Sequence, residues 1–180
     1  MRAKKLILSM LVIAIFLWLS QAESWAVEAY MHIEASGGEI RGSATVPGYE
    51  HWHPVAAFGH NLYLPVDPTT GQASGQRRHE PVRIVKPVDE SSPLLYSALI
   101  TGEHNLQVEI DFLRFNNEGQ RERFFTIRLQ DAMLTSISPS LIPSTQNNQM
   151  MEIVNIAYRT IIWTEDRTGS ETQDSWYMQH

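Results

Sequence analysis

The chain of 180 residues contains no cysteine. This absence excludes a disulfide-stapled scaffold, a thiolate metal site, a blue-copper centre and a cysteine nucleophile. Basic residues are in the minority, because 14 Lys and Arg stand against 20 Asp and Glu, for a formal net charge of −6. A nucleic-acid-binding domain needs a basic face, so this balance argues against nucleic acid as a partner. With 10 Gly and 9 Pro the chain is not of low complexity, and its length suits one globular domain.

The residues before position 27 have the three-part pattern of a Sec-type secretory signal peptide. A basic start is followed by the apolar run Leu6–Leu19 and by a polar stretch that ends in small residues. About 20 apolar residues are needed for a transmembrane helix, and this run is shorter. Because Ser24 and Ala26 suit a cleavage site, we expect cleavage after Ala26. Cleavage after Ala22 and an uncleaved anchor are the alternatives.

The expected organisation is therefore a signal peptide, residues 1–26, followed by one domain, residues 27–180. Cleavage would place this domain in the periplasm or outside the cell, with no membrane attachment. If the signal is not used, we expect assembly in the cytoplasm. A domain of this size buries enough surface on folding to form a stable core without disulfides or a structural metal.

The pattern of residues 27–180 is mainly β. Leu106–Phe115 alternates apolar and polar residues, and the alternation flips near Leu113, which predicts a bulge or strand end. The turn Asn116–Gly119 then joins a hairpin. We expect eight or nine short strands in a barrel or sandwich, without an internal repeat. The other strand candidates are Ala29–Glu34, Ile40–Val46, His53–His60, Asn61–Leu64, Arg121–Leu129, Ala132–Ser138 and Met151–Glu165, the longest.

One short helix is predicted within Ser91–Gly102. Ser92 suits the N-cap, Pro93 the first helical position, and Gly102 a left-handed end. The expected apolar face consists of Leu94, Leu95, Ala98 and Leu99.

The segment Pro65–Glu80 has turn-forming residues and no apolar period. The stretches on both sides read as strands, so we expect a long loop that projects from a sheet. A loop of this length without regular structure is usually functional or disordered.

Three features could carry chemistry, and each also has an ordinary structural interpretation. His51 and His53 flank Trp52, so on a strand both rings would share a face and, with His60, form a weak metal site. Ordinary surface or partly buried histidines are the alternative, and we predict no cofactor. The carboxylates Glu109, Asp111 and Glu122 would be either a catalytic pair or members of a cross-strand ion ladder with Arg114, Arg121 and Arg123. The aromatic residues would be a sugar platform or core residues: Tyr49, Trp52, Trp163, Trp176 and Tyr177.

Several motifs in this order resemble Hcp, the tube protein of bacterial type VI secretion. The resemblance covers residues 28–180, and no single motif would suffice for it. The motifs are HNLYLPVD at His60–Asp67, then Thr70–Gly71, Gly75, Arg77 and His79, SSPLLYSALITG at Ser91–Gly102, IIWT at Ile161–Thr164 and DSW at Asp174–Trp176.

The resemblance implies a mainly β fold, an Hcp-like β-barrel of two sheets with one short flanking helix at about 92–101. It implies hexameric rings that stack into a secreted tube, with sheath, spike and effector proteins as further partners and no catalysis. It also implies that the loop contacts neighbouring subunits and rings, through Asp67, Thr70, Gly71, Gly75, Arg77 and His79.

The sequence departs from the family at two places. Hcp proteins ordinarily begin close to their first strand, whereas a signal peptide precedes it here, and His51–His53 matches no family motif. The alternative function is therefore an exported module that binds a metal or carbohydrate on an Hcp-like barrel.

Overall fold

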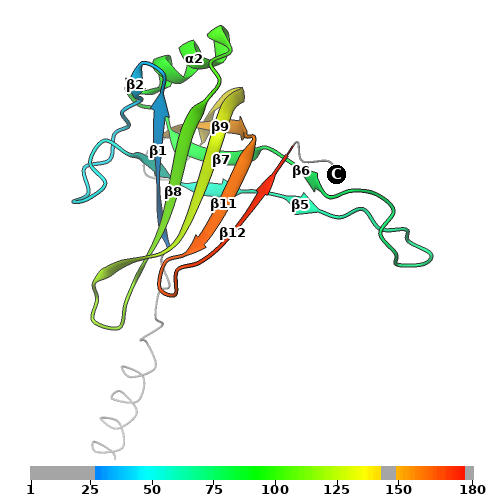
Figure 1. The fold of residues 1–180 in the computed structure, drawn as a ribbon. Helices are drawn as coiled ribbons and strands as arrows, with labels where there is room; N and C mark the ends of the chain where they lie inside the picture. The colour runs from blue at the N-terminus through cyan, green and yellow to red at the C-terminus, as the bar shows by residue number, and fades with distance from the viewer. Residues whose placement is uncertain (1–26, 143–148, 177–180) are drawn as a thin grey trace, which may run out of the picture.

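Two antiparallel sheets that share one long strand form the body of the protein (Figure 1). The computed structural model describes residues 27–142 and 149–176, so the predicted signal peptide and Tyr177 lie outside the described residues. The first sheet contains β1 (Glu28–Ala35), β2 (Gly38–Glu39), β3 (His53–Val55), β8 (Leu106–Phe115), the first part of β9 (Arg121–Ile142), β11 (Thr160–Glu165) and β12 (Ser170–Ser175). The second contains the rest of β9 with β10 (Gln149–Ala157), β7 (Val82–Pro87) and β4 (Ala57–Gly59).

The mainly β fold with two sheets and a short helix is confirmed. Apolar side chains of alternating strand positions fill the space between the sheets, and among the most deeply buried are Met31, Ile33, Leu106, Ile110, Leu129, Ile156 and Ile161. The predicted flip in β8 is a register shift against β9 between Phe112 and Leu113. Such a bulge moves the following side chains to the other face, so that Leu113 is buried with Tyr30 rather than in the main core.

Strand β9 belongs to both sheets because it bends at Asp131. Asp131 has a φ of 48°, which is rare for a residue with a side chain. Before the bend β9 pairs with β11, and after it β9 pairs with β10. The prediction that Met151–Glu165 is one strand, the longest, was therefore wrong. The chain that pairs with β9 is interrupted at the same place. Tyr158 and Arg159 separate it into β10 and β11.

The segment Ile40–Val46, which was expected to be a strand, has no regular strand structure. Its backbone is hydrogen-bonded instead to His51 and Trp52, which follow a turn. The Gly42 N–H donates to the His51 carbonyl (2.6 Å), and the Ala44 N–H donates to the Trp52 carbonyl (2.9 Å). A Cβ atom at Gly42 would lie 2.6 Å from the Trp52 carbonyl oxygen. The two backbone segments lie so close together here that only a residue without a side chain fits at position 42. A polar stretch that sequence reasoning left out, Ser170–Ser175, forms β12.

Helix α2 (Ser92–Thr101) lies at one end of the sheets and has the predicted bounds (Figure 1). Gly102 is left-handed as predicted, with a φ of 66°. Two details of the prediction were wrong. Ser91 rather than Ser92 occupies the N-cap position, and Leu94 is 52% exposed rather than part of the buried face.

The Ser92 hydroxyl takes part instead in a buried polar cluster beneath the start of α2. Lys86, whose side chain is fully buried, donates from Nζ to Glu152 Oε1 (2.8 Å) and Asp89 Oδ1 (2.9 Å). Ser92 Oγ donates to the same Glu152 oxygen (2.7 Å). Burial works against the charge of Asp89, but hydrogen bonds from Ser91, Lys86 and Ser43 lower the pKa of Asp89 to about 2. One ammonium group thus ties the segment before α2 to the second sheet.

We predict that Gly102→Val destabilises the protein by about 1 kcal/mol or more, because a β-branched residue is strained at positive φ. Gly37→Val is the matched control, since Gly37 has open space around its Cβ position and no positive φ. Its expected effect is within about 0.5 kcal/mol. Urea midpoints measure both, and equal midpoints for the two variants would contradict the prediction.

We also predict that Lys86→Met costs about 3–5 kcal/mol, because it leaves buried carboxylates without their cation. The double variant Lys86→Met/Glu152→Met should lose clearly less, since it removes a charge of each sign. Arg167→Met, at an exposed ion pair with Glu165, should leave the urea midpoint unchanged. A midpoint for Lys86→Met equal to that of Arg167→Met would show that the buried ammonium group is not needed.

Candidate assembly interface

A ribbon of two short strands extends from the body and carries a long loop (Figure 1). The ribbon pairs β5 (Leu62–Tyr63) with β6 (Arg78–His79). A further bridge joins Val66 to Ala73. The expectation of a projecting loop is confirmed, and its backbone pairing shows that it is an ordered element.

The tip of the loop is a turn closed by Asp67. Its Oδ1 atom accepts the backbone N–H groups of Thr69 and Thr70, each at 2.8 Å, and the Thr70 hydroxyl at 3.2 Å. These backbone bonds lower the pKa of Asp67. The Gly71 N–H donates to the Asp67 carbonyl (2.8 Å), and Gly71 has a φ of 69°. Three of the predicted interface residues therefore shape the tip, and this gives the loop a defined form before any partner binds.

The middle of the loop exposes apolar surface. The Ser74 N–H donates to the Pro65 carbonyl (2.9 Å), and a Cβ at Gly75 would contact the Pro65 ring at 3.7 Å. The two sides of the loop thus lie against each other here. Four apolar residues in this short region are between 37% and 56% exposed: Leu62, Tyr63, Leu64 and Val66. Exposed apolar patches occur at interaction surfaces, so this region is a candidate for one.

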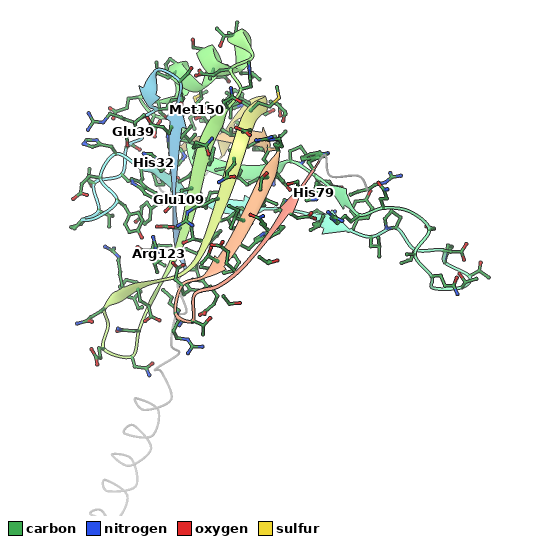
Figure 2. All side chains as sticks on the ribbon, in the orientation of Figure 1. His32, Glu39, His79, Glu109, Arg123 and Met150 are labelled. Carbon is green, nitrogen blue, oxygen red and sulfur yellow. The ribbon has the colours of Figure 1, made fainter. Side chains whose placement is uncertain are left out.

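The base of the loop is fixed by His79, which Figure 2 labels near β12. The His79 ring is stacked on Trp176, with centroids 5.8 Å apart and planes at 23°. Its Nδ1 atom lies 2.9 Å from the Tyr158 hydroxyl and its Nε2 atom 3.1 Å from Asp174 Oδ2. Arg77 forms a two-pronged ion pair with the same Asp174 carboxylate, and the Arg77 hydrogen bonds lower the pKa of Asp174.

Tyr158 connects this contact to a second histidine on the other side of the loop. His60 Nε2 lies 2.6 Å from the Tyr158 hydroxyl, and Tyr158 is only 2% exposed. Burial, followed by the Asp174 charge, raises the pKa of Tyr158, so the phenol stays neutral. Burial, followed by His79, lowers the pKa of His60. Both ends of the ribbon are therefore held by one buried hydroxyl group.

The six residues expected at the interface thus separate into two groups. Arg77 and His79 meet at the base, together with the DSW motif that the resemblance used. The others shape the tip or the middle of the loop. Tyr158 was missed by sequence reasoning, because its partners come from distant parts of the chain. The sequence gives no local signal for this role, because the stretch IAYRT lies inside one continuous strand-like pattern.

The histidines near Trp52 do not share a face, so that prediction was wrong. His51 is exposed in a turn with a φ of 67°, whereas His53 is fully buried in β3. His53 Nε2 lies 2.8 Å from the Ile40 carbonyl oxygen and Nδ1 lies 3.2 Å from Ser91 Oγ. The described ranges hold no group of three His, Cys, Asp or Glu residues spaced for a metal ion.

The charged hairpin forms the expected ion ladder. Arg123 lies beside Glu109, both labelled in Figure 2 (3.8 Å), and it also contacts Asp111 (3.2 Å) and Asp166 (2.9 Å). The third predicted carboxylate, Glu122, pairs with Arg114 at 2.6 Å. Arg121 pairs with Glu28 rather than with the ladder. These carboxylates neutralise arginines, which is the structural interpretation of the pattern.

The aromatic side chains pack mostly against one another and the core. Tyr49 stacks on Tyr30 and meets Trp52 edge to face, with centroids 5.0 Å apart in both pairs. Trp163 and Trp176 pack against the main core. Among the helices that the structure describes, none has the length and hydropathy to cross a membrane.

Comparisons with known proteins agree with this geometry. The family model described as "Type VI secretion system effector, Hcp" matches residues 30–164. The "Major exported protein" of Pseudomonas aeruginosa is 36% identical over 139 residues, which are 75% of this chain and 81% of that protein.

Solved structures of Hcp proteins are similar over most of the chain. The crystal structure of an Hcp protein has a TM-score of 0.78 at 31% identity and covers 86% of this chain and 100% of its own. A mutant Hcp1 from E. coli EAEC 042 pathovar has a TM-score of 0.76 at 31% identity, with coverage of 84% and 100%. The secreted protein Hcp3 of Pseudomonas aeruginosa reaches 0.69 at 31% identity, with coverage of 84% and 99%. The chain therefore belongs to the Hcp family of type VI secretion tube proteins.

Proposed function

We propose that copies of this protein associate into hexameric rings, that the rings stack into the secreted inner tube, and that the β5–β6 loop makes contacts between copies. The observation that carries this proposal is the ordered, projecting loop with exposed apolar residues and a buried anchor. The interface residues we propose are those expected from the sequence, Asp67, Thr70, Gly71, Gly75, Arg77 and His79, of which the buried His79 acts by anchoring the loop.

The energetics of the loop support this role. A flexible loop would lose conformational entropy on binding, whereas the Asp67 turn and the His79 anchor hold this loop in place beforehand. The exposed side chains, such as Leu64 and Val66, each offer apolar area whose burial contributes about 25 cal/mol per Å². A projecting loop that contacts a different surface on the next copy forms a head-to-tail interface, and such an interface gives a ring when the rotation between copies closes.

The remaining partners and the location follow from the same proposal. Sheath and spike proteins would surround and cap the tube, and effector proteins would travel with it. The protein would act as a structural component and not as an enzyme. An exported location is supported by the name of its relative from Pseudomonas aeruginosa, "Major exported protein".

We further propose that residues 1–26 are a secretory signal and that residues 27–180 are exported to the periplasm or beyond. The support is the basic start, the apolar run Leu6–Leu19 and the small residues at Ser24 and Ala26. If the signal is not used, the rings would assemble in the cytoplasm.

The loop is tested by replacing residues 67–75 with a Gly/Ser linker in residues 27–180. The mature domain should have a light-scattering mass of about 105 kDa, since six subunits of about 17–18 kDa form the ring. The variant should keep its circular dichroism spectrum and lose this mass. As a matched control, a Gly/Ser replacement of Asn116–Gly119, another exposed turn, should keep the ring.

Two outcomes would contradict the proposal, and they are distinguishable. A monomeric mature domain at high concentration would exclude ring formation itself. A ring-sized mass for the loop variant would exclude the loop as the contact while leaving ring formation intact.

The signal is tested by expressing the full chain and sequencing the N-terminus of the exported protein. We expect it to begin at Val27. Leu11→Arg, which places a charge in the apolar run, should abolish export, and Ser9→Ala should not. An exported or cytoplasmic protein that begins at Met1 in every fraction would overturn the signal assignment.

A further inference from the structure

We propose that the base of the β5–β6 loop is an acid-sensitive latch. Tyr158 holds His60 and His79 when both imidazole rings are neutral or when one of them is protonated, and it releases them when both are protonated. The latch is the set His60, Arg77, His79, Tyr158 and Asp174. Its effect on assembly depends on the proposed function, but its opening does not.

The hydrogen-bond partners determine where the protons lie when both histidines are neutral. The Asp174 carboxylate can only accept, so His79 Nε2 must carry the proton on the side that faces it (3.1 Å). His79 Nδ1 is then an acceptor and receives the Tyr158 O–H (2.9 Å). Because the only proton of the Tyr158 hydroxyl is used there, His60 Nε2 must donate to the Tyr158 oxygen (2.6 Å). Each of these three contacts then joins one donor to one acceptor.

One added proton fits this arrangement. If His60 takes it, His60 Nε2 still donates to Tyr158 and the remaining bonds do not change. If His79 takes it, Nδ1 becomes a donor to Tyr158, and the Tyr158 O–H turns to His60, whose Nε2 then has to be the unprotonated nitrogen. In both cases the phenol proton keeps an acceptor.

A second proton does not fit. With both rings protonated, His60 and His79 each donate to the Tyr158 oxygen, and the Tyr158 O–H has no nitrogen left to accept it. Tyr158 is 2% exposed, and an unsatisfied buried donor is costly. The two positive rings would also lie on opposite sides of one hydroxyl group and repel each other.

The surrounding charges do not remove this conflict. Asp174 is the carboxylate that faces His79, and it already pairs with Arg77. Glu80 favours a charge on His60, but burial and His79 outweigh it, and the pKa of His60 is lowered. The other faces of the rings pack on aromatic residues, His79 on Trp176 and His60 on Trp163.

The direction of the pH effect follows from these protonation states. A released loop has histidines that take up protons near pH 6.5, whereas the anchored loop keeps His60 neutral to lower pH. The released loop therefore binds more protons, and the anchor weakens as the pH falls below about 6.5. If the loop joins copies in a tube, acidification would loosen the tube.

Hydrogen exchange measured by mass spectrometry tests the latch in the mature domain, at a concentration where it is monomeric. Exchange of residues 60–80 is compared with that of β8 from about pH 7.5 to about pH 5, after correction for the intrinsic rate. This range lies above the pKa of His53, which burial and Lys86 lower to about 4. Protection of the ribbon should fall by up to about tenfold per pH unit, as one linked proton requires, while β8 stays protected.

Three variants make the result specific. His60→Gln can still donate to Tyr158 and cannot gain a charge, so its ribbon should keep constant protection. Tyr158→Phe should lose protection at neutral pH and lose the pH dependence. His104→Gln removes an exposed histidine elsewhere and should behave as the unchanged protein.

The latch is overturned if ribbon protection does not change with pH, if His60→Gln follows the unchanged protein, or if β8 loses protection together with the ribbon. These results are independent of assembly. A protein that forms no rings but shows the ribbon-specific loss would retain the latch and refute the proposed function.

Discussion

The loop that we assign to assembly has no core of its own, so the buried hydroxyl of Tyr158 decides where it is held. Tyr158 lies in the two-residue break between β10 and β11, which exists because β9 bends at Asp131 and passes from one sheet to the other. Arg159, the other residue of the break, forms an ion pair with Asp131. The change of sheet and the anchor of the loop thus meet at these two residues of the break.

Two parts of the described chain are each fixed by a buried polar cluster. Lys86 and Glu152 secure the chain before α2, and Tyr158 with His79 secures the ribbon. Buried polar groups cost solvation, so such clusters add less to stability than apolar packing, but each has one arrangement that satisfies its partners. In a subunit whose loop has to meet a neighbour in a fixed register, a defined position matters more than a small gain in stability.

Local sequence patterns predicted the features that depend on nearby residues. The alternation of Leu106–Phe115 and its flip predicted β8 and its bulge, and Gly102 predicted the end of α2. Features that depend on distant contacts were missed. The pattern of Met151–Glu165 stays strand-like across the break at Tyr158, because both parts are strands and only the bend of β9 separates them. His51 was misplaced because a left-handed turn puts it and His53 on different sides of the chain. The anchor joins four separate segments, so no spacing in the sequence reveals it.

The central claim is that the loop is ordered in the free subunit and is the surface that copies of the protein share. The most direct test compares amide hydrogen exchange of residues 27–180 below and above the concentration of assembly. The account predicts that the ribbon amides, such as the Glu80 N–H bonded to the Asn61 carbonyl, are protected in the monomer, and that the tip around Asp67 gains protection on assembly. Gains confined to other surfaces, with the loop unchanged, would contradict it.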